Sequence, residues 1–80
     1  MRFVYILRSR DCPDRFYVGS TGDMKHRLSE HNGRKGRHTS KYAPWLCLVS
    51  MEFADDSRAD AFEKYLKTGS GRAFSNRHFR

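Results

Sequence analysis

Cysteine, proline and tryptophan are all scarce in this chain of 80 residues. Its two cysteines, Cys12 and Cys47, are too few for the disulfide framework of a small secreted domain. Together with four histidines they show no paired ligand spacing, so we do not expect a zinc site. Residues 1–7 are a short apolar run followed at once by charge, which is unlike a signal peptide. We therefore expect a cytoplasmic protein with reduced thiols.

Acidic residues and long hydrophobic runs are also few. There are 9 Asp and Glu against 16 Lys and Arg, which gives a net charge of +7. No segment approaches the length of a membrane span, so we do not expect a membrane protein. The excess of positive charge favours a polyanionic partner, with nucleic acid before a membrane surface. The alternative is a basic protein that has no such partner.

The length predicts one small domain that spans residues 1–80. Aromatic residues make up 14% of the chain, which is typical of a globular protein rather than a disordered one. A chain of this size has little room for a deep pocket. We therefore expect a shallow groove, which suits a polymer better than a small metabolite.

Hydrophobic patterning predicts an α+β fold, a small three-stranded and mostly antiparallel sheet flanked by helices. The expected elements are strands at 3–7, 15–20 and 45–53, helices at 23–32 and 57–67, and a basic loop at 34–44. In the third strand, the alternation predicts one shared face for Trp45, Cys47, Val49, Met51 and Phe53.

Turn and capping residues set the expected helix ends. Asp23 is a candidate N-cap of the first helix and Gly33 its stop. Ser57 and Asp60 resemble a capping box for the second helix, which residues 69–71 (Gly-Ser-Gly) would end. One last basic turn of helix at 73–79 would pack through its phenylalanine at position 74.

Several polar side chains are suited to phosphodiester chemistry. A hairpin of the first two strands would bring Tyr5 and Tyr17 together, and Gly19 would leave the strand end uncrowded. Arg27 can hold a phosphate through two hydrogen bonds, and Glu63 offers hard oxygen to Mg²⁺ or Mn²⁺.

Each of these residues also has an ordinary role. The tyrosines could be plain strand aromatics, Arg27 a solvated arginine, and Glu63 half of a surface pair with Lys67. His31 follows Arg27 at i+4 and could simply pack or cap the end of its helix.

The order of the motifs resembles the GIY-YIG nuclease superfamily, and its small single-domain bacterial members in particular. The matching segments are Phe-Val-Tyr at 3–5, Tyr-Val-Gly-Ser-Thr at 17–21, Arg27-Leu28, His31-Asn32, Glu-Lys-Tyr-Leu-Lys at 63–67 and Gly-Ser-Gly-Arg-Ala-Phe at 69–74. The resemblance implies that Glu63 binds Mg²⁺ or Mn²⁺ and that Arg27 contacts the scissile phosphate. It also implies that Tyr5 or Tyr17, with Tyr17 favoured, acts as or relays to the general base, and that His31 completes the hydrogen-bond network.

Two positions depart from the family pattern. The first motif reads Phe-Val-Tyr, so only its tyrosine is kept, and Ser20 stands where some relatives have a lysine. A free phenol has a pKa of about 10 and needs a cation beside it to act as a base. Lys25, Lys41 or the metal ion would have to supply that charge.

Basic residues outside this set are expected to contact the nucleic-acid backbone without reading its sequence. They are Arg34, Lys35, Arg37 and Lys41 in the loop, and Arg72, Arg77 and Arg80 near the C-terminus. The sequence therefore predicts a metal-dependent endonuclease, with DNA favoured over RNA as substrate and a repair or recombination role. A non-catalytic nucleic-acid-binding module and a subunit of a repair assembly remain the alternatives. Specificity is expected to be low or to come from a protein partner.

Overall fold

The computed structural model describes residues 1–33 and 39–80. In chain order the elements are β1 (Arg2–Ser9), β2 (Phe16–Thr21), α1 (Met24–Asn32), the 3₁₀ helix η1 (Ser40–Tyr42), β3 (Trp45–Phe53), α2 (Asp56–Leu66) and α3 (Gly69–His78). The three strands form one antiparallel sheet, which confirms the predicted α+β class. No helix within the described ranges combines the length and the hydrophobicity that crossing a bilayer requires.

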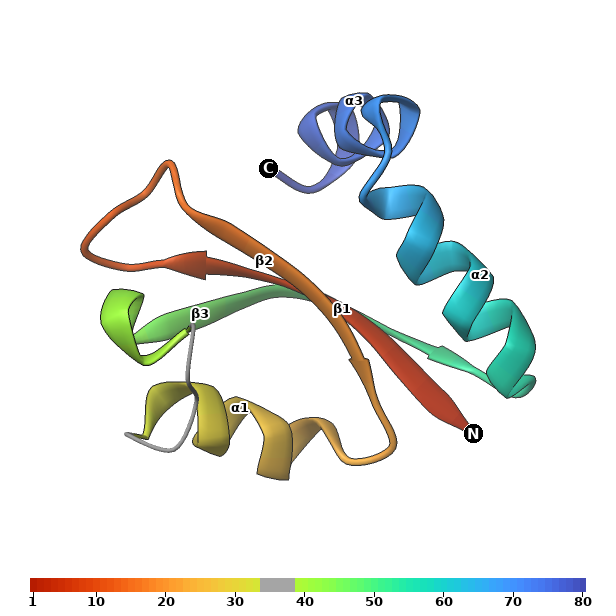
Figure 1. Cartoon of the computed structure of the whole chain (residues 1–80), viewed down its shortest axis with the longest axis horizontal. Coiled ribbons are helices and arrows are strands. Elements are labelled where there is room, and N and C mark those ends of the chain that lie inside the picture. The colour runs from red at the N-terminus through yellow and green to blue at the C-terminus, as the bar shows by residue number, and fades with distance from the viewer. Residues whose placement is uncertain (34–38) are drawn as a thin grey trace.

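The first strand lies in the middle of the sheet, whose order is β2-β1-β3 (Figure 1). Four consecutive side chains of β1, Val4 to Leu7, are fully buried. A strand that is paired on both edges and covered on both faces reads as a continuous apolar run, which is why this segment does not alternate. By contrast β2 is an edge strand, and one of its edges is free of strand pairing.

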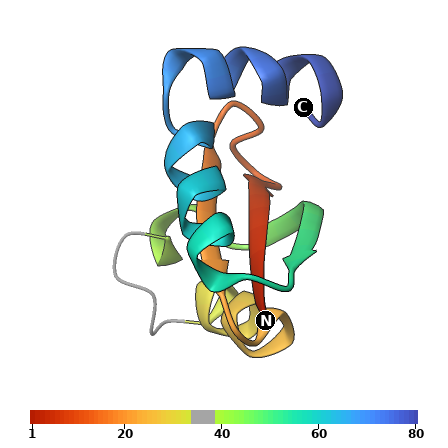
Figure 2. The same cartoon turned by 90° about the vertical axis from the view of Figure 1, so that its right-hand side faces the viewer.

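Helices cover both faces of the sheet (Figures 1 and 2). On one face Tyr5, Leu7 and Trp45 form a buried cluster with Met24 and Leu28 of α1. On the other face α2 and α3 pack over the remaining core. The buried members of this second cluster are Val4, Ile6, Ala59 and Leu66, with Phe62 and Phe74 packed against them.

A bulge in β3 makes the predicted alternation of that strand wrong. Ile6 pairs with Val49 but Leu7 pairs with Cys47, so Leu48 is an extra residue between them. One extra residue reverses the face on which every later side chain lies. Val49 therefore lies on the α2 side, whereas Trp45 packs on the α1 side.

The start of α1 is as predicted and the start of α2 is not. The Asp23 side chain caps α1 by accepting a hydrogen bond from the His26 amide, and Gly33 ends the helix. Helix α2 begins one residue earlier than expected, because Asp55 rather than Ser57 is its N-cap. The Asp55 carboxylate accepts from the amides of Ser57 and Arg58, so the proposed Ser57–Asp60 box does not form.

The glycine-rich segment begins a third helix instead of only ending the second. Thr68 caps α3 by accepting a hydrogen bond from the Gly71 amide at 3.1 Å. A Cβ at Gly71 would collide with the backbone carbonyl of Tyr65 and the backbone of Leu66, so the close junction of α2 and α3 requires glycine here. The predicted last turn is thus a helix of 10 residues, Gly69–His78.

Candidate active site

Two tyrosines and a histidine meet on the α1 side of the sheet. The ring centroids of Tyr17 and His31 are 4.8 Å apart, and those of Tyr5 and Tyr17 are 6.2 Å apart. The Tyr5 hydroxyl lies 2.9 Å from His31 Nε2. Tyr5 is fully buried, whereas Tyr17 on the edge strand is half-buried. The structure therefore brings together three of the five residues predicted to be catalytic.

Gly19 makes this arrangement possible. It pairs with Tyr5 across the sheet, and a Cβ at position 19 would lie 2.5 Å from the Tyr5 hydroxyl oxygen. No real Cβ tolerates that contact, so any other residue would push the phenol away. The prediction of an uncrowded strand end is wrong, because the Tyr5 side chain fills the space beside Gly19 that was expected to admit a backbone or phosphate.

His31 is held on both sides of its ring. Its Nδ1 lies 2.8 Å from the Thr39 hydroxyl, while Nε2 faces Tyr5. Burial lowers the pKa of His31, and the charge of Arg27 lowers it further against the opposing effect of Glu30. A neutral imidazole carries one N–H, so it can donate to one of these hydroxyls while it accepts from the other. Tyr5, His31 and Thr39 form a continuous hydrogen-bonded chain.

Arg27 presents an unused donor toward this site. Its Nε lies 3.2 Å from Glu30 Oε1, but the direction is not that of a hydrogen bond, and the buried Nε has no partner among the described residues. An ion pair on a helix surface contributes about 0–1 kcal/mol. A phosphate that offers better geometry can therefore take this guanidinium away from Glu30. After burial, the charge of Arg27 is the next cause of the lowered pKa of His31, its predicted neighbour at i+4.

Glu63 comes from the helix on the opposite face of the sheet. It is partly buried, and its Oε2 accepts a hydrogen bond from Lys67 Nζ at 3.0 Å. Burial, together with the Tyr17 and Glu63 side chains, raises the pKa of Tyr5 to about 12 against the opposing effect of Arg27.

The residues present fit a hydrated Mg²⁺ or Mn²⁺ ion better than a fully ligated metal. No group of three or more His, Cys, Asp or Glu side chains gathers in the described part of the chain. Mg²⁺ commonly keeps several waters and uses one or two protein carboxylates together with substrate phosphate. Glu63 can fill that role, because its bond to the exposed ammonium of Lys67 is a surface ion pair that a cation can displace.

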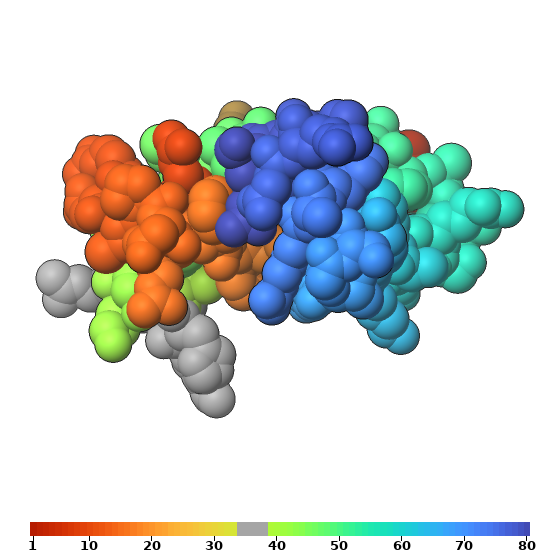
Figure 3. All heavy atoms as spheres, turned by 90° about the horizontal axis from the view of Figure 1, so that it is seen from above, coloured from red at the N-terminus to blue at the C-terminus, as the bar shows by residue number. Residues whose placement is uncertain are grey.

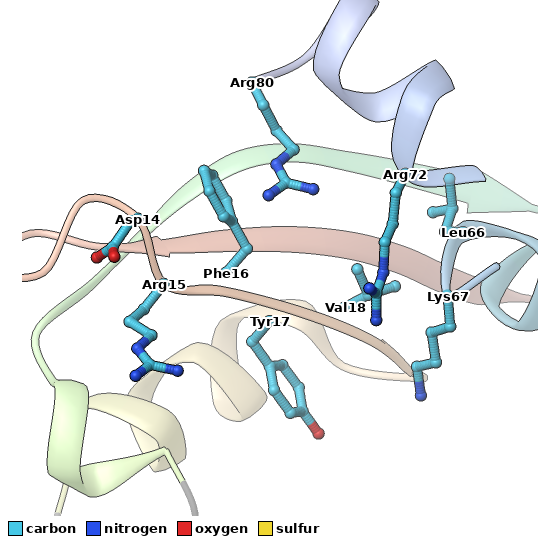
Figure 4. A pocket seen from close by; sticks show the side chains of 9 residues that line it. All are labelled: Asp14, Arg15, Phe16, Tyr17, Val18, Leu66, Lys67, Arg72 and Arg80. Atoms are coloured by element: carbon cyan, nitrogen blue, oxygen red, sulfur yellow. The ribbon is translucent and has the colours of Figure 1, made fainter. Parts of the chain in front are cut away.

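A basic groove adjoins these residues (Figure 4). It has a volume of about 480 Å³ and runs between β2 and the chain from the end of α2 to the C-terminus. From above, the dark-blue C-terminal end of the chain abuts the orange segment that leads into β2 (Figure 3). Tyr17 and Lys67 line this groove, so the groove and the catalytic candidates share one surface.

Arg72 and Lys41, two of the residues predicted to contact nucleic acid, lie in the described part of the chain. Arg72 lines the groove. Lys41 is exposed on η1, with its Nζ 5.6 Å from the ring centroid of Tyr42. Arg34, Lys35 and Arg37 lie outside the described residues.

Some residues of the site carry no sequence signal that could have singled them out. Thr39 is one threonine in a basic stretch, and only the fold brings its hydroxyl to His31. The sequence predicts Lys67 only as a surface partner of Glu63. That pair forms, and Lys67 also lines the groove. Phe16 gave only a strand signal, although it lies on the groove wall.

The chain was compared with known protein families. Residues 1–77 match the family model described as the GIY-YIG catalytic domain. The chain belongs to the GIY-YIG family. The match confirms the resemblance seen in the sequence, and it supports the predicted enzyme class, an endonuclease.

Two kinds of curated relative are among the matches. One is a structure-specific endonuclease subunit SLX1 of Scheffersomyces stipitis, which is 40% identical over 67 residues, or 75% of this chain and 20% of the relative. The other group includes UPF0213 proteins. That of Streptococcus pneumoniae is 35% identical over 66 residues (81% of this chain, 65% of the relative), and that of Oceanobacillus iheyensis is 36% identical over 66 residues (81% and 74%). The chain spans about a fifth of the SLX1 subunit and about two thirds of the streptococcal protein.

Proposed function

We propose that this chain is a divalent-metal-dependent endonuclease that hydrolyses phosphodiester bonds in DNA. The observation that carries the proposal is the set of side chains at the edge of β2. Tyr5, Tyr17 and His31 are in contact there, Arg27 Nε has no hydrogen-bond partner among the described residues, and the charge of Glu63 on α2 contributes to the raised pKa of Tyr5. A base, a guanidinium and a metal carboxylate are the groups that attack on a phosphodiester requires.

Tyr17 is the better candidate for the general base. The raised pKa of Tyr5 keeps that phenol protonated, and its hydroxyl is already engaged with His31. Tyr17 is half-buried on the edge strand and lines the groove, where a water and a phosphate can reach it. In this scheme Tyr17 takes the proton of the attacking water, while Tyr5 and His31 hold the surrounding hydrogen bonds in place.

Arg27 and Glu63 would act on the phosphate itself. The Arg27 guanidinium donates to the non-bridging oxygens and stabilises the charge that builds up as water attacks. Glu63 is the residue that would hold Mg²⁺ or Mn²⁺, which when bound supplies further positive charge beside the phosphate. Lys67, which is bonded to Glu63, would be released to contact the substrate if Glu63 held a cation.

The biological setting is part of the proposal. The name of the SLX1 relatives describes a subunit of a structure-specific endonuclease. By analogy we propose DNA as the substrate, a repair or recombination role in the cytoplasm, and a protein partner that supplies specificity. The loop residues Arg34, Lys35, Arg37 and Lys41, together with Arg72, are proposed to contact the DNA backbone.

The test is cleavage of supercoiled plasmid and of branched and flapped DNA, in Mg²⁺ or Mn²⁺ and in EDTA. Glu63→Gln keeps the size of the side chain and removes its charge. Glu52→Gln is the matched control, because Glu52 is an exposed residue of β3. We expect cleavage that requires metal, that falls about 100-fold or more in Glu63→Gln and that persists in Glu52→Gln.

Two results would contradict the proposal in different ways. A folded wild-type protein that cuts none of these DNAs would favour the non-catalytic binding module. Cleavage that survives Glu63→Gln would show that Glu63 is not the metal ligand, or that the activity belongs to a contaminant.

A further inference from the structure

The groove beside β2 carries more positive charge than the protein itself neutralises. Its lining includes Arg15, Lys67, Arg72 and Arg80 and a single acidic residue, Asp14. Among the described residues, only Lys67 of these four cations makes an ion pair. Cations that face a concave surface without partners attract an anion there.

Arg72 and Arg80 are two cations that line the same groove. Both extend from the C-terminal segment toward β2 (Figure 4). Partial burial, and then the positive charge of Arg72, lower the pKa of the Arg80 guanidinium. A bound phosphate between these residues would relieve that repulsion.

One wall of the groove is flat and aromatic. The Arg80 guanidinium carbon lies 3.6 Å from the centroid of the Phe16 ring, which is close stacking of a planar cation on an aromatic face. Arg80 is exposed, so the groove side of its guanidinium can accept another ring. Unpaired bases stack on aromatic rings and on arginine planes, and basic grooves with such surfaces bind single strands.

The groove is continuous with the catalytic candidates. Tyr17 lines the groove and its ring stacks near His31, while the ammonium of Lys67 bonds to Glu63. A strand whose scissile phosphate lies at Tyr17 and Glu63 would therefore place a neighbouring nucleotide in the groove.

We propose that this groove binds one unpaired nucleotide of the DNA strand next to the phosphate that is cut. Its base stacks on the Arg80–Phe16 pair, and Arg72 and Lys67 hold its phosphate. The inference rests on the proposed function and adds a substrate class to it. Stacking on this pair needs an exposed base face, which a base within a duplex does not offer, so the site favours unpaired DNA.

The test measures binding of a fluorescent oligo(dT) by anisotropy. EDTA is present to prevent metal-dependent cleavage, so binding is measured separately from cutting. Arg80→Lys keeps the charge and removes the planar surface, and we expect it to weaken binding about 5- to 100-fold. Arg72→Gln should lower the slope of log affinity against log salt by about 0.7, the value for one phosphate contact on a single strand. Arg58→Gln, which removes an exposed charge of α2 outside the groove, is the control for loss of net charge.

Phe16 supplies a second, independent pair of variants. Phe16→Leu should weaken binding as Arg80→Lys does, and Phe16→Tyr, which keeps the aromatic face, should retain wild-type affinity. Urea unfolding of each variant identifies any that fail to fold, and the exposed Arg80→Lys and Arg72→Gln variants keep the test decisive in that case.

Several outcomes would overturn the inference. One is that Arg80→Lys and Arg72→Gln each bind oligo(dT) as Arg58→Gln does. Another is that a duplex of equal length shows the same losses as the single strand. If the wild-type protein cuts DNA and the groove variants bind oligo(dT) normally, the proposed function stands but the groove has no part in it. If the groove variants lose binding but the wild-type protein cuts no DNA, nucleotide binding in the groove would be supported and endonuclease activity would be refuted.

Discussion

Tyr5 and Tyr17 have the same side chain in different surroundings. Tyr5 is fully buried, and its pKa is raised to about 12 chiefly by that burial. Tyr17 lies on the edge strand and faces the groove. Because a general base must give up its own proton before it accepts another, these surroundings suit Tyr17 to proton transfer and Tyr5 to holding His31 in place.

Replacing each hydroxyl separately distinguishes these roles. Tyr17→Phe removes the proposed base, and we expect the single-turnover cleavage rate to fall about 100-fold or more. Tyr5→Phe removes one hydrogen bond to His31, worth about 1 kcal/mol, and should lower the rate about 5- to 10-fold. A larger loss in Tyr5→Phe than in Tyr17→Phe would reverse the assignment.

His31 makes stability depend on pH. Its pKa is lowered by burial and by Arg27, whereas an unfolded histidine titrates at about 6.5. Below that pH the unfolded chain binds a proton that the folded chain does not. The contribution of His31 is therefore complete above about pH 6.5 and is lost as the pH falls from there toward the lowered pKa.

Urea unfolding across this pH range measures the effect. We expect the free energy of unfolding to decrease on acidification in the wild type and to decrease less in His31→Gln. His26→Gln is the matched control, because His26 is an exposed histidine of the same helix. Equal slopes for His31→Gln and wild type would show that His31 is not the group responsible.

At the scale of the elements, α3 depends on its cap. Thr68 accepts from the Gly71 amide and donates to the Tyr65 carbonyl, so it joins the end of α2 to the start of α3. Thr68→Ala should lower the free energy of unfolding by about 0.5–2 kcal/mol, as measured in urea, and Thr68→Ser should restore most of it. Arg72 lies on this helix, so Thr68→Ala should also lower the affinity for oligonucleotide. A Thr68→Ala variant as stable as wild type would show that the junction does not rely on this cap.

The expected elements were correct where a local pattern is sufficient. The bounds of β3, and of α1 with its Asp23 cap, were predicted from the sequence and are confirmed. The bulge at Leu48 was not predicted, because every second residue from Trp45 to Phe53 is apolar and only pairing with β1 shows the extra residue. The third helix was underestimated for a related reason, since its first turn contains two glycines that locally favour a break.

For the whole molecule, the position of β2 at the sheet edge decides where chemistry can occur. The strand order leaves this edge unpaired, and Gly19 contributes no side chain to it. The close approach of Tyr5 to Gly19 places its phenol at this edge, beside Tyr17 and His31. A central strand with a larger residue at position 19 would separate them.

The sequence by itself determined the α+β class and the excess positive charge, and it predicted Tyr5, Tyr17, Arg27, His31 and Glu63 as a catalytic set. These follow from local periodicity, from composition and from motif order. The tertiary structure decided which groups meet. The contact of Thr39 with His31 and the stacking of Arg80 on Phe16 join residues that are far apart or separately unremarkable along the chain. Such contacts depend on strand order and helix packing, which no local pattern encodes.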